Sequence, residues 1–300
     1  MTGHAPTVTV IIPTYNSSGT LKIALETVLW QDFVDFEVLV VGDGCTDDSE
    51  AVVASFGDDR VHWLNLPSNS GTPCMPRNEA LRLAKGKWVA YLGHDDLWFP
   101  WHLSELMGYL ERNNSDFSFS LGLVLGPEGV VEPFTLPDKA WDRKKYLSPS
   151  NWLHRKGLIE VIGYWSPPVG KIGDDRDFLE RILAANVRLG FRRQLTVLKF
   201  PAGLWRMYSL TSNFPQSSYV EAMYRNAAEL RLELLMELAT FISQQGLGFS
   251  RSVSRLPKPL YALIGWAFDM YGLQRWPVNN LLYRRWRRSA GLSGKKRMPN

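Results

Sequence analysis

The first hundred residues alternate short apolar runs with segments of helical periodicity, and this alternation limits the fold more than any other feature. The apolar runs are rich in β-branched residues and end in polar loops, which predicts buried strands. They span residues 8–13, 36–41, 61–66 and 88–92. Between the first two runs, apolar residues recur at helical spacing from Leu21 to Val28. Strands that alternate with helices predict an α/β fold with a mostly parallel sheet flanked by helices.

The composition is that of a folded intracellular protein. The 300 residues are 45% hydrophobic, which is enough for a full core in one or two domains. The cysteines, Cys45 and Cys74, are too few for a disulfide framework and predict a reducing cytoplasm. We expect neither a secretory signal at the N-terminus nor a membrane span, because no apolar stretch reaches the roughly 20 residues that a span needs.

Charge is concentrated at the C-terminus. Residues 251–300 carry 11 Lys and Arg but only one acid, Asp269, and residues 281–288 interleave aromatic residues with four arginines. This pattern is typical of interfacial segments that meet anionic lipid, and a solvated tail is the alternative. Without a recognisable nucleic-acid-binding module we expect no nucleic acid partner. The expected location is the cytoplasm, either in solution or peripherally at the inner face of the membrane.

Polar side chains follow three of the predicted strands. They are Thr14, Tyr15 and Asn16 after the first strand, Asp43 after the second, and Asp95 and Asp96 after the fourth. The carboxyl ends of parallel strands meet at one edge of a sheet, where ligands of α/β proteins bind. Neither GxGxxG nor GxxxxGK[ST] occurs, which excludes the usual dinucleotide and Walker loops.

These residues form a recognition set for a nucleoside diphosphate. Asp43 can accept a hydrogen bond from a base, Tyr15 can stack on its ring, and Arg77 can reach base or phosphate. Adjacent carboxylates at a buried strand end repel each other, so a divalent cation at Asp95 and Asp96 would stabilise them and neutralise a diphosphate. A solvated turn is the alternative for these two acids.

The segments VTVIIPTYN, FEVLVVGDGCTDD and NSGTPCMPRNEALRLAKGKWVAYLGHDD follow one another in the first hundred residues. In order, spacing and context they resemble the signatures of family 2 glycosyltransferases, which have the GT-A fold. The resemblance implies an inverting enzyme that uses a sugar nucleotide, usually with Mg²⁺ or Mn²⁺. It also implies a GT-A catalytic domain over residues 1–210, with a nucleotide-sugar-binding half (1–100) and an acceptor-binding half (101–210). A helical C-terminal region with the basic tail would follow over residues 211–300.

The resemblance also implies roles for single residues. Pro13 and Tyr15, in one loop with Thr14 and Asn16, would contact the nucleoside, and Asp43 would hold the base. Asp43 favours a base with an imide N–H, so a UDP- or dTDP-sugar is preferred. Arg77 would lie near the base or phosphates, Asp95 would contact ribose or metal, and Asp96 would ligate the metal. Gly42 and Gly93 depart from the family, which commonly has Asp at both positions.

The second half must supply a general base, because an acceptor hydroxyl has too high a pKa to attack unaided. Residues 171–181 resemble the family segment in which an Asp precedes a helix that bears an Arg. Spacing back from Arg181 favours Asp175 as the base, with Asp174 as the alternative. The same acids could instead favour a helix N-terminus through its dipole.

These inferences together predict a metal-dependent inverting glycosyltransferase. It would move a sugar from a nucleoside-diphosphate sugar to a glycan or glycolipid acceptor in polysaccharide, glycolipid or glycoconjugate synthesis. A nucleotidyltransferase on a related sheet is one alternative, and the missing lysine-bearing Gly-rich loop argues against it. A non-catalytic nucleotide-sugar-binding scaffold is the other, and the Asp175 segment argues against it.

Overall fold

The computed structural model describes residues 5–133, 148–167, 173–207, 210 and 212–244. The basic tail over residues 251–300 therefore lies outside the described residues, and the predictions made for it stay predictions. In the part described, no helix is both long and apolar enough to cross a membrane. The chain divides into two compact units, Met1–Leu235 and Met236–Asn300. The predicted boundary at residue 210 falls inside the first unit.

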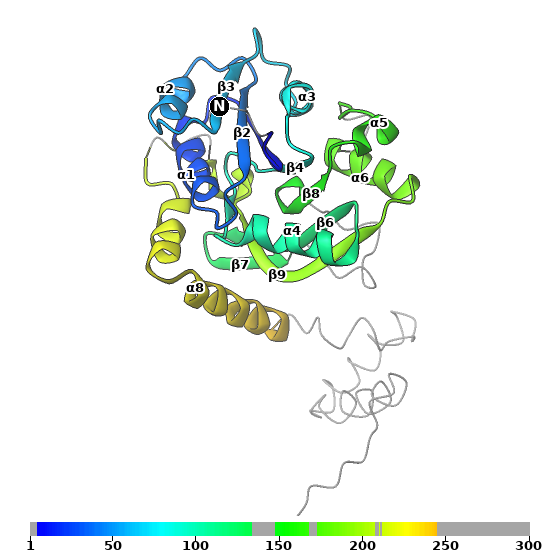
Figure 1. The fold of residues 1–300 in the computed structure, drawn as a ribbon. Coiled ribbons are helices and arrows are strands. Elements are labelled where there is room, and N and C mark those ends of the chain that lie inside the picture. The colour runs from blue at the N-terminus through cyan, green and yellow to red at the C-terminus, as the bar shows by residue number, and fades with distance from the viewer. Residues whose placement is uncertain (1–4, 134–147, 168–172, 208–209, 211, 245–300) are drawn as a thin grey trace, which may run out of the picture. The chain divides into compact units, whose positions relative to one another are not determined.

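The N-terminal half is a parallel βα arrangement (Figure 1). Its elements are β1 (Val8–Thr14), α1 (Ser18–Leu29), β2 (Phe36–Gly42), α2 (Ser49–Ala54), β3 (Val61–Asn65), α3 (Cys74–Leu83) and β4 (Trp88–Tyr91). The strands pair in parallel in the order β3-β2-β1-β4. Each strand therefore ends at the same edge of the sheet, as the alternation of the sequence predicts.

The following elements extend the same sheet with mixed polarity. They are β5 (Leu97–Trp98), α4 (His102–Asn113), β6 (Phe117–Gly126), β7 (Gly129–Pro133), the short 3₁₀ helix η2 (Pro149–Asn151), β8 (Trp152–Arg155), α5 (Leu158–Ile162), α6 (Asp174–Ala184), β9 (Leu189–Lys199), α7 (Ala202–Trp205) and α8 (Gln216–Gln244). The sheet continues from β4 through β8, β6 and β9 to β5, while β7 pairs with β6. Strand β8 is antiparallel to both β4 and β6, and β9 is parallel to β6.

Helices cover both faces of the sheet because its strands are apolar on both sides. On one face, Val10 and Ile12 of β1 pack with Leu25 of α1 and Leu106 of α4. On the other face, residues of α3 and α6 pack with the alternate strand positions, including Ile11 of β1. Figure 1 shows α1 and α2 on one side of the parallel strands and α3 on the other. The predicted α/β fold with flanking helices is confirmed, with a sheet that is mixed beyond β4.

Two sequence predictions differ from the structure in extent. The sequence pattern predicts a helix over residues 177–185, but α6 begins at Asp174, so Asp174, Asp175 and Asp177 lie in its first turn. The sequence pattern also predicts a strand over residues 195–200, which is the end of the longer β9 that begins at Leu189. Its first part, with Arg192 and Arg193, lacks the continuous apolar run by which the sequence marks a strand.

Candidate active site

A cavity of about 440 Å³ lies at the carboxyl ends of β1, β2 and β4. The predicted site residues that line it are Pro13, Thr14, Tyr15, Asp43, Arg77, Asp95, Asp96 and Asp175. These residues come from both halves of the chain. Asn16 and Asp174 are not among the lining residues.

Asn16 has a contact that accounts for its position next to the cavity. Its φ of 43° is in the left-handed region, which Asn tolerates better than most residues. Its Oδ1 accepts a hydrogen bond of 2.8 Å from the backbone N–H of Thr46. The side chain thus ties the loop after β1 to the loop after β2.

Asp43 presents an acceptor that the described residues leave without a partner. The side chain is only 4% exposed. Its Oδ2 accepts hydrogen bonds of 3.0 Å from both the backbone N–H and the hydroxyl of Ser70. Its Oδ1 is buried and has no partner among the described residues. A buried carboxylate oxygen without a donor is costly, so a ligand N–H at this point would be favoured.

Gly42 is required by the packing around the loop that follows it. A Cβ at this position would lie 2.6 Å from Oδ1 of Asn65. Asn65 in turn accepts a hydrogen bond from the N–H of Cys45 and donates one to its carbonyl, each at 2.8 Å. The space of a carboxylate at position 42 is therefore taken by the amide that holds the Asp43 loop.

Asp95 and Asp96 occupy different environments although they are adjacent. Asp96 is fully buried, and its carboxylate accepts hydrogen bonds from Ser150 Oγ at 2.6 Å, Lys199 Nζ at 3.1 Å and the Phe200 N–H at 3.3 Å. Burial raises the pKa of Asp96, which the ammonium of Lys199 opposes. Asp95 is partly exposed and lines the cavity, and its carbonyl accepts a hydrogen bond of 3.0 Å from Gln216.

The donor set near these residues fits a divalent ion that is held partly by its substrate. Mg²⁺ and similar ions are commonly bound by one or two carboxylates together with substrate phosphates. The described residues contain no group of three His, Cys, Asp or Glu that could hold a metal by themselves. Asp95 has the open position that such an ion needs, whereas both oxygens of Asp96 already accept hydrogen bonds. The contacts thus favour Asp95 as the metal ligand. The sequence had instead favoured Asp96 for this role.

Gly93 also lies close to both acids. A Cβ there would approach Oδ1 of Asp95 and Oδ2 of Asp96 to 3.0 Å each. An additional acidic side chain at position 93 would therefore have to displace one of them.

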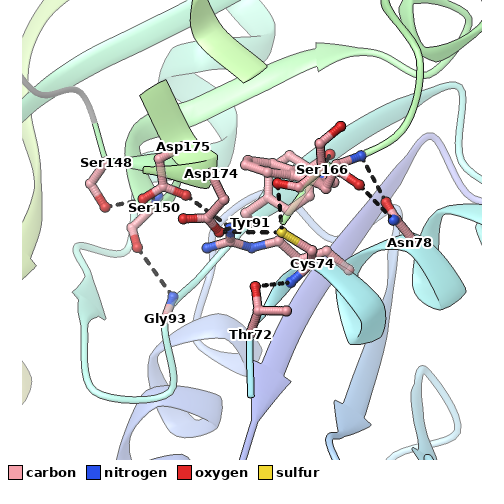
Figure 2. A network of polar contacts seen from close by, with 12 residues as sticks. Thr72, Cys74, Asn78, Tyr91, Gly93, Ser148, Ser150, Ser166, Asp174 and Asp175 are labelled. Atoms are coloured by element: carbon pink, nitrogen blue, oxygen red, sulfur yellow. Dashed lines mark hydrogen bonds and ion pairs between the residues drawn. The ribbon is translucent and has the colours of Figure 1, made fainter. Parts of the chain in front are cut away.

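The first turn of α6 carries two carboxylates next to Arg77, and one of them, Asp175, lines the cavity. Nη1 of Arg77 lies 2.9 Å from Oδ2 of Asp174 and 2.8 Å from Oδ1 of Asp175. The guanidinium also lies over the ring of Trp165, 4.3 Å from its centroid. Figure 2 shows Asp174 and Asp175 beside Cys74, which comes from the start of α3. Arg77 of α3 therefore links the cavity wall to both candidate general bases of α6.

The two acids of this pair differ in what they face. Asp175 lines the cavity. Asp174 faces inward, where its Oδ2 lies 3.7 Å from Sγ of Cys74. Burial, followed by the charge of Asp175, raises the pKa of Asp174, and Arg77 opposes this shift. Asp177, the remaining acid of the turn, instead pairs with Arg181 at 2.8 Å.

Comparison with known proteins agrees with this geometry. The family described as glycosyl transferase family 2 matches residues 9–160, which include the ends of β1, β2 and β4 and the strand β8. The chain belongs to this family.

Two curated relatives of this chain are named for different acceptors. It is 30% identical over 132 residues to the Escherichia coli enzyme WfgD, named a UDP-Glc:α-D-GlcNAc-diphosphoundecaprenol β-1,3-glucosyltransferase. That match covers 44% of this chain and 52% of the relative. It is 33% identical over 126 residues to the poly(ribitol-phosphate) β-N-acetylglucosaminyltransferase TarP of Staphylococcus aureus, covering 41% of this chain and 37% of TarP. The chain thus spans about half the length of WfgD and a smaller share of TarP.

Solved structures support the fold. The Staphylococcus aureus TarS fragment 1–349 in complex with UDP-GlcNAc aligns with a TM-score of 0.57 and 24% identity, over 69% of this chain and 62% of that chain. A mannosyltransferase from Pyrobaculum calidifontis, solved with GDP-Man and Mn²⁺, aligns with a TM-score of 0.54 and 16% identity, over 98% and 89% of the two chains.

The aromatic residues that follow Asp96 are, from the sequence alone, candidates for the floor of a sugar site or for the core, and three of them lie in the core. Trp98, Phe99 and His102 are fully buried. The indole of Trp98 stacks on His102 with centroids 4.1 Å apart and donates a hydrogen bond of 2.7 Å to the carbonyl of Ser150. Burial lowers the pKa of His102 to about 3, so its ring is neutral at physiological pH.

Among the lining residues that the sequence did not predict, two parts of the wall contact Asp96. One is the segment Ser148, Pro149 and Ser150, which falls in a stretch that shows no clear periodicity. Figure 2 shows Ser150 next to Gly93, whose N–H donates a hydrogen bond of 3.1 Å to the serine hydroxyl. The other is Lys199 at the end of β9. The rule that polar residues at strand ends line the site would have identified Lys199, because a strand was expected there.

Proposed function

We propose that this protein transfers a sugar from a nucleoside-diphosphate sugar to a hydroxyl of a glycan or glycolipid, with inversion at the anomeric carbon. One observation carries the proposal. Three carboxylates line a single cavity. Asp43 can accept a hydrogen bond from the nucleobase, Asp95 is suited to a metal ion, and Asp175 lies at the wall that α6 forms. Membership of glycosyl transferase family 2 supports the same reaction class.

The nucleoside binds at the β1 and β2 side of the cavity. Pro13, Thr14 and Tyr15 line this side, and Tyr15 is 42% exposed, which leaves its ring accessible for stacking. The unpartnered Oδ1 of Asp43 favours an imide N–H, so uracil or thymine is the preferred base. A UDP-sugar is thus the first donor to test, and a dTDP-sugar is the second. The naming of WfgD as a UDP-Glc enzyme supports this order.

Asp95 would hold a divalent ion, Mn²⁺ or Mg²⁺. When bound, it supplies Lewis-acid stabilisation of the charge that develops on the leaving diphosphate. Asp96, the ligand first expected from the sequence, supports the turn that carries Asp95. The N–H of Asp96 donates to the carbonyl of Gly93 at 3.0 Å, which closes this turn.

Asp175 is the general base, and Asp174 is the alternative. Asp175 accepts the proton of the acceptor hydroxyl as the oxygen attacks the anomeric carbon on the face opposite the diphosphate. One displacement of this kind inverts the configuration and requires no covalent intermediate with the protein. Arg77 pairs with both acids, and its charge opposes the rise in the pKa of Asp174 that burial causes.

The acceptor is a glycan or a glycolipid of a polysaccharide or glycoconjugate pathway. WfgD is named for a lipid diphosphate acceptor and TarP for poly(ribitol phosphate). These names support an acceptor of the glycan or glycolipid class and favour neither kind over the other. We place the reaction in the cytoplasm, either in solution or, through the basic tail over residues 251–300, at the inner face of the membrane.

A transfer assay with an NMR readout tests the proposal. The protein is incubated with UDP-glucose, UDP-GlcNAc or dTDP-glucose, Mn²⁺ and a panel of glycan and glycolipid acceptors, and the anomeric coupling of the product is measured. Product of opposite anomeric configuration to the donor is the expected result, and retained configuration would refute the single displacement. Donor binding without transfer to any acceptor in the panel would favour the non-catalytic alternative. Release of pyrophosphate from UTP and a sugar phosphate would favour the nucleotidyltransferase.

A further inference from the structure

Lys199 and Asp96 form a charged pair between the buried core and the cavity. Nζ of Lys199 lies 3.1 Å from Oδ2 and 3.4 Å from Oδ1 of Asp96. The side chain of Lys199 is 21% exposed and lines the cavity, whereas that of Asp96 is fully buried. The lysine comes from the end of β9 and the aspartate from the loop after β4. Both residues therefore lie at the cavity wall, and the ammonium is the more exposed of the two charged groups.

The contacts of Asp96 identify it as an anchor for this lysine. Besides the ammonium, its oxygens accept hydrogen bonds from Ser150 Oγ at 2.6 Å and from the N–H of Phe200 at 3.3 Å. A metal ion on Asp96 would have to displace these donors and repel the ammonium of Lys199 at the same time. Isolated buried ion pairs add little net stability, so stability does not explain why this pair lines a cavity.

We infer that Lys199 binds the diphosphate of the donor, and that Asp96 acts through Lys199 by holding its side chain at the cavity wall. The inference rests on the proposed function, because it assigns a residue to the donor that this function requires. The phosphates approach two acidic residues, Asp95 and Asp96, which would repel them. Lys199 cancels the charge of Asp96 from within the protein, and a metal ion would cancel the charge of Asp95. Lys199 thereby offers the phosphates an ammonium donor at the cavity wall that does not depend on the metal.

Binding measurements with three probes separate this role from a structural one. The probes are UDP, uridine and pyrophosphate, each with and without Mn²⁺, and the affinities are measured by calorimetry or by ligand-observed NMR for the weak ones. Lys199→Met should weaken UDP and pyrophosphate by about ten- to a hundredfold, since one charge-assisted contact is lost. Uridine, which carries no phosphate, should bind as before. Lys199→Arg should retain most of the affinity, and Lys22→Met, which removes an exposed lysine outside the cavity, should have no effect.

A second variant guards against misfolding, because Lys199→Met leaves the buried Asp96 without its cation. In the double variant Asp96→Asn/Lys199→Met both charges are gone, so neither is buried alone. It should lose phosphate affinity like Lys199→Met. The inference is wrong if folded Lys199→Met or the double variant keeps the wild-type ratio of uridine to UDP affinity.

The single variant Asp96→Asn distinguishes an anchor from a metal ligand. If Asp96 holds Lys199, this variant keeps the Mn²⁺-dependent gain in UDP affinity. Loss of that gain would make Asp96 a ligand and overturn the inference. Failure of the wild type to bind any of the three probes is a different result, because it would contradict the proposed donor site as a whole.

Discussion

Replacing Asp43 with Asn should weaken the binding of UDP without weakening that of pyrophosphate. In the structure, Oδ2 of Asp43 accepts two hydrogen bonds from Ser70, and Oδ1 accepts none from the described residues. An Asn at this position has one oxygen for two acceptor positions. If the oxygen stays toward Ser70, the amide N–H₂ faces the N–H of the base; if it turns toward the base, the amide meets the donors of Ser70. Either orientation sets donor against donor at a site that is 4% exposed.

The magnitude follows from the contact that is lost. A hydrogen bond to a charged group contributes about 1.5–3 kcal/mol, which corresponds to roughly a ten- to hundredfold change in Kd. Calorimetry with UDP measures this change, and pyrophosphate serves as the probe without a base. Asp59→Asn is the matched control, because Asp59 is exposed and outside the cavity. UDP methylated at N3 of uracil should lose affinity for the wild type by a similar factor, because it lacks the N–H. Unchanged UDP affinity in Asp43→Asn, or an equal loss of pyrophosphate affinity, would refute the assignment of Asp43 to the base.

Three further predictions concern the other walls of the site. Asp175→Asn should lower kcat by about a hundredfold or more, since general bases contribute about 10²–10⁴ in rate, while the affinity for the UDP-sugar is retained. The control is Asp177→Asn, which changes an acid of the same helical turn that pairs with Arg181 and should retain activity. An activity loss confined to Asp174→Asn would move the base to Asp174. Asp95→Asn should abolish the Mn²⁺-dependent gain in UDP affinity measured by calorimetry, and an unchanged gain would contradict its role as metal ligand. Gly42→Asp should destabilise the protein by about 1–3 kcal/mol in urea unfolding, because its Cβ would lie 2.6 Å from Oδ1 of Asn65; Gly203→Ala, which meets nothing within 4 Å, should be neutral. Equal stabilities of these two variants would show that Asn65 does not exclude a side chain at position 42.

The N-terminal half is predictable because its signals are local. A β-branched run followed by a polar loop predicts a buried strand wherever it occurs, and residues 8–13 and 36–41 correspond to β1 and β2 within one residue. Pairing of successive strands in parallel then places their ends at one edge. The sequence pattern therefore predicts that Asp43, Asp95 and the loop with Tyr15 lie at one cavity, where the structure has them.

The second half depends on contacts between distant residues. Strand β8 lies between β4 and β6 in the sheet. Its four residues, Trp152–Arg155, show no periodicity from which these neighbouring strands could be predicted. The 3₁₀ helix before it carries Ser150 to Asp96, across 54 positions of the chain. Such pairings depend on the whole sheet, and a local pattern contains no information about them.

The sequence by itself determined the α/β fold, the family and the set of residues gathered at the ends of the first strands. The tertiary structure decided what each of these residues faces. Asp95 and Asp96 are adjacent and both line the cavity, but the turn closed by the Gly93 carbonyl leaves Asp95 partly exposed and places the buried carboxylate of Asp96 in contact with Lys199. Arg77 likewise meets Asp174 and Asp175 only because α3 and α6 cover the same face of the sheet. The physical reason is that burial and the nearest opposite charge fix the behaviour of an ionisable group, and both are supplied by segments far away in the chain.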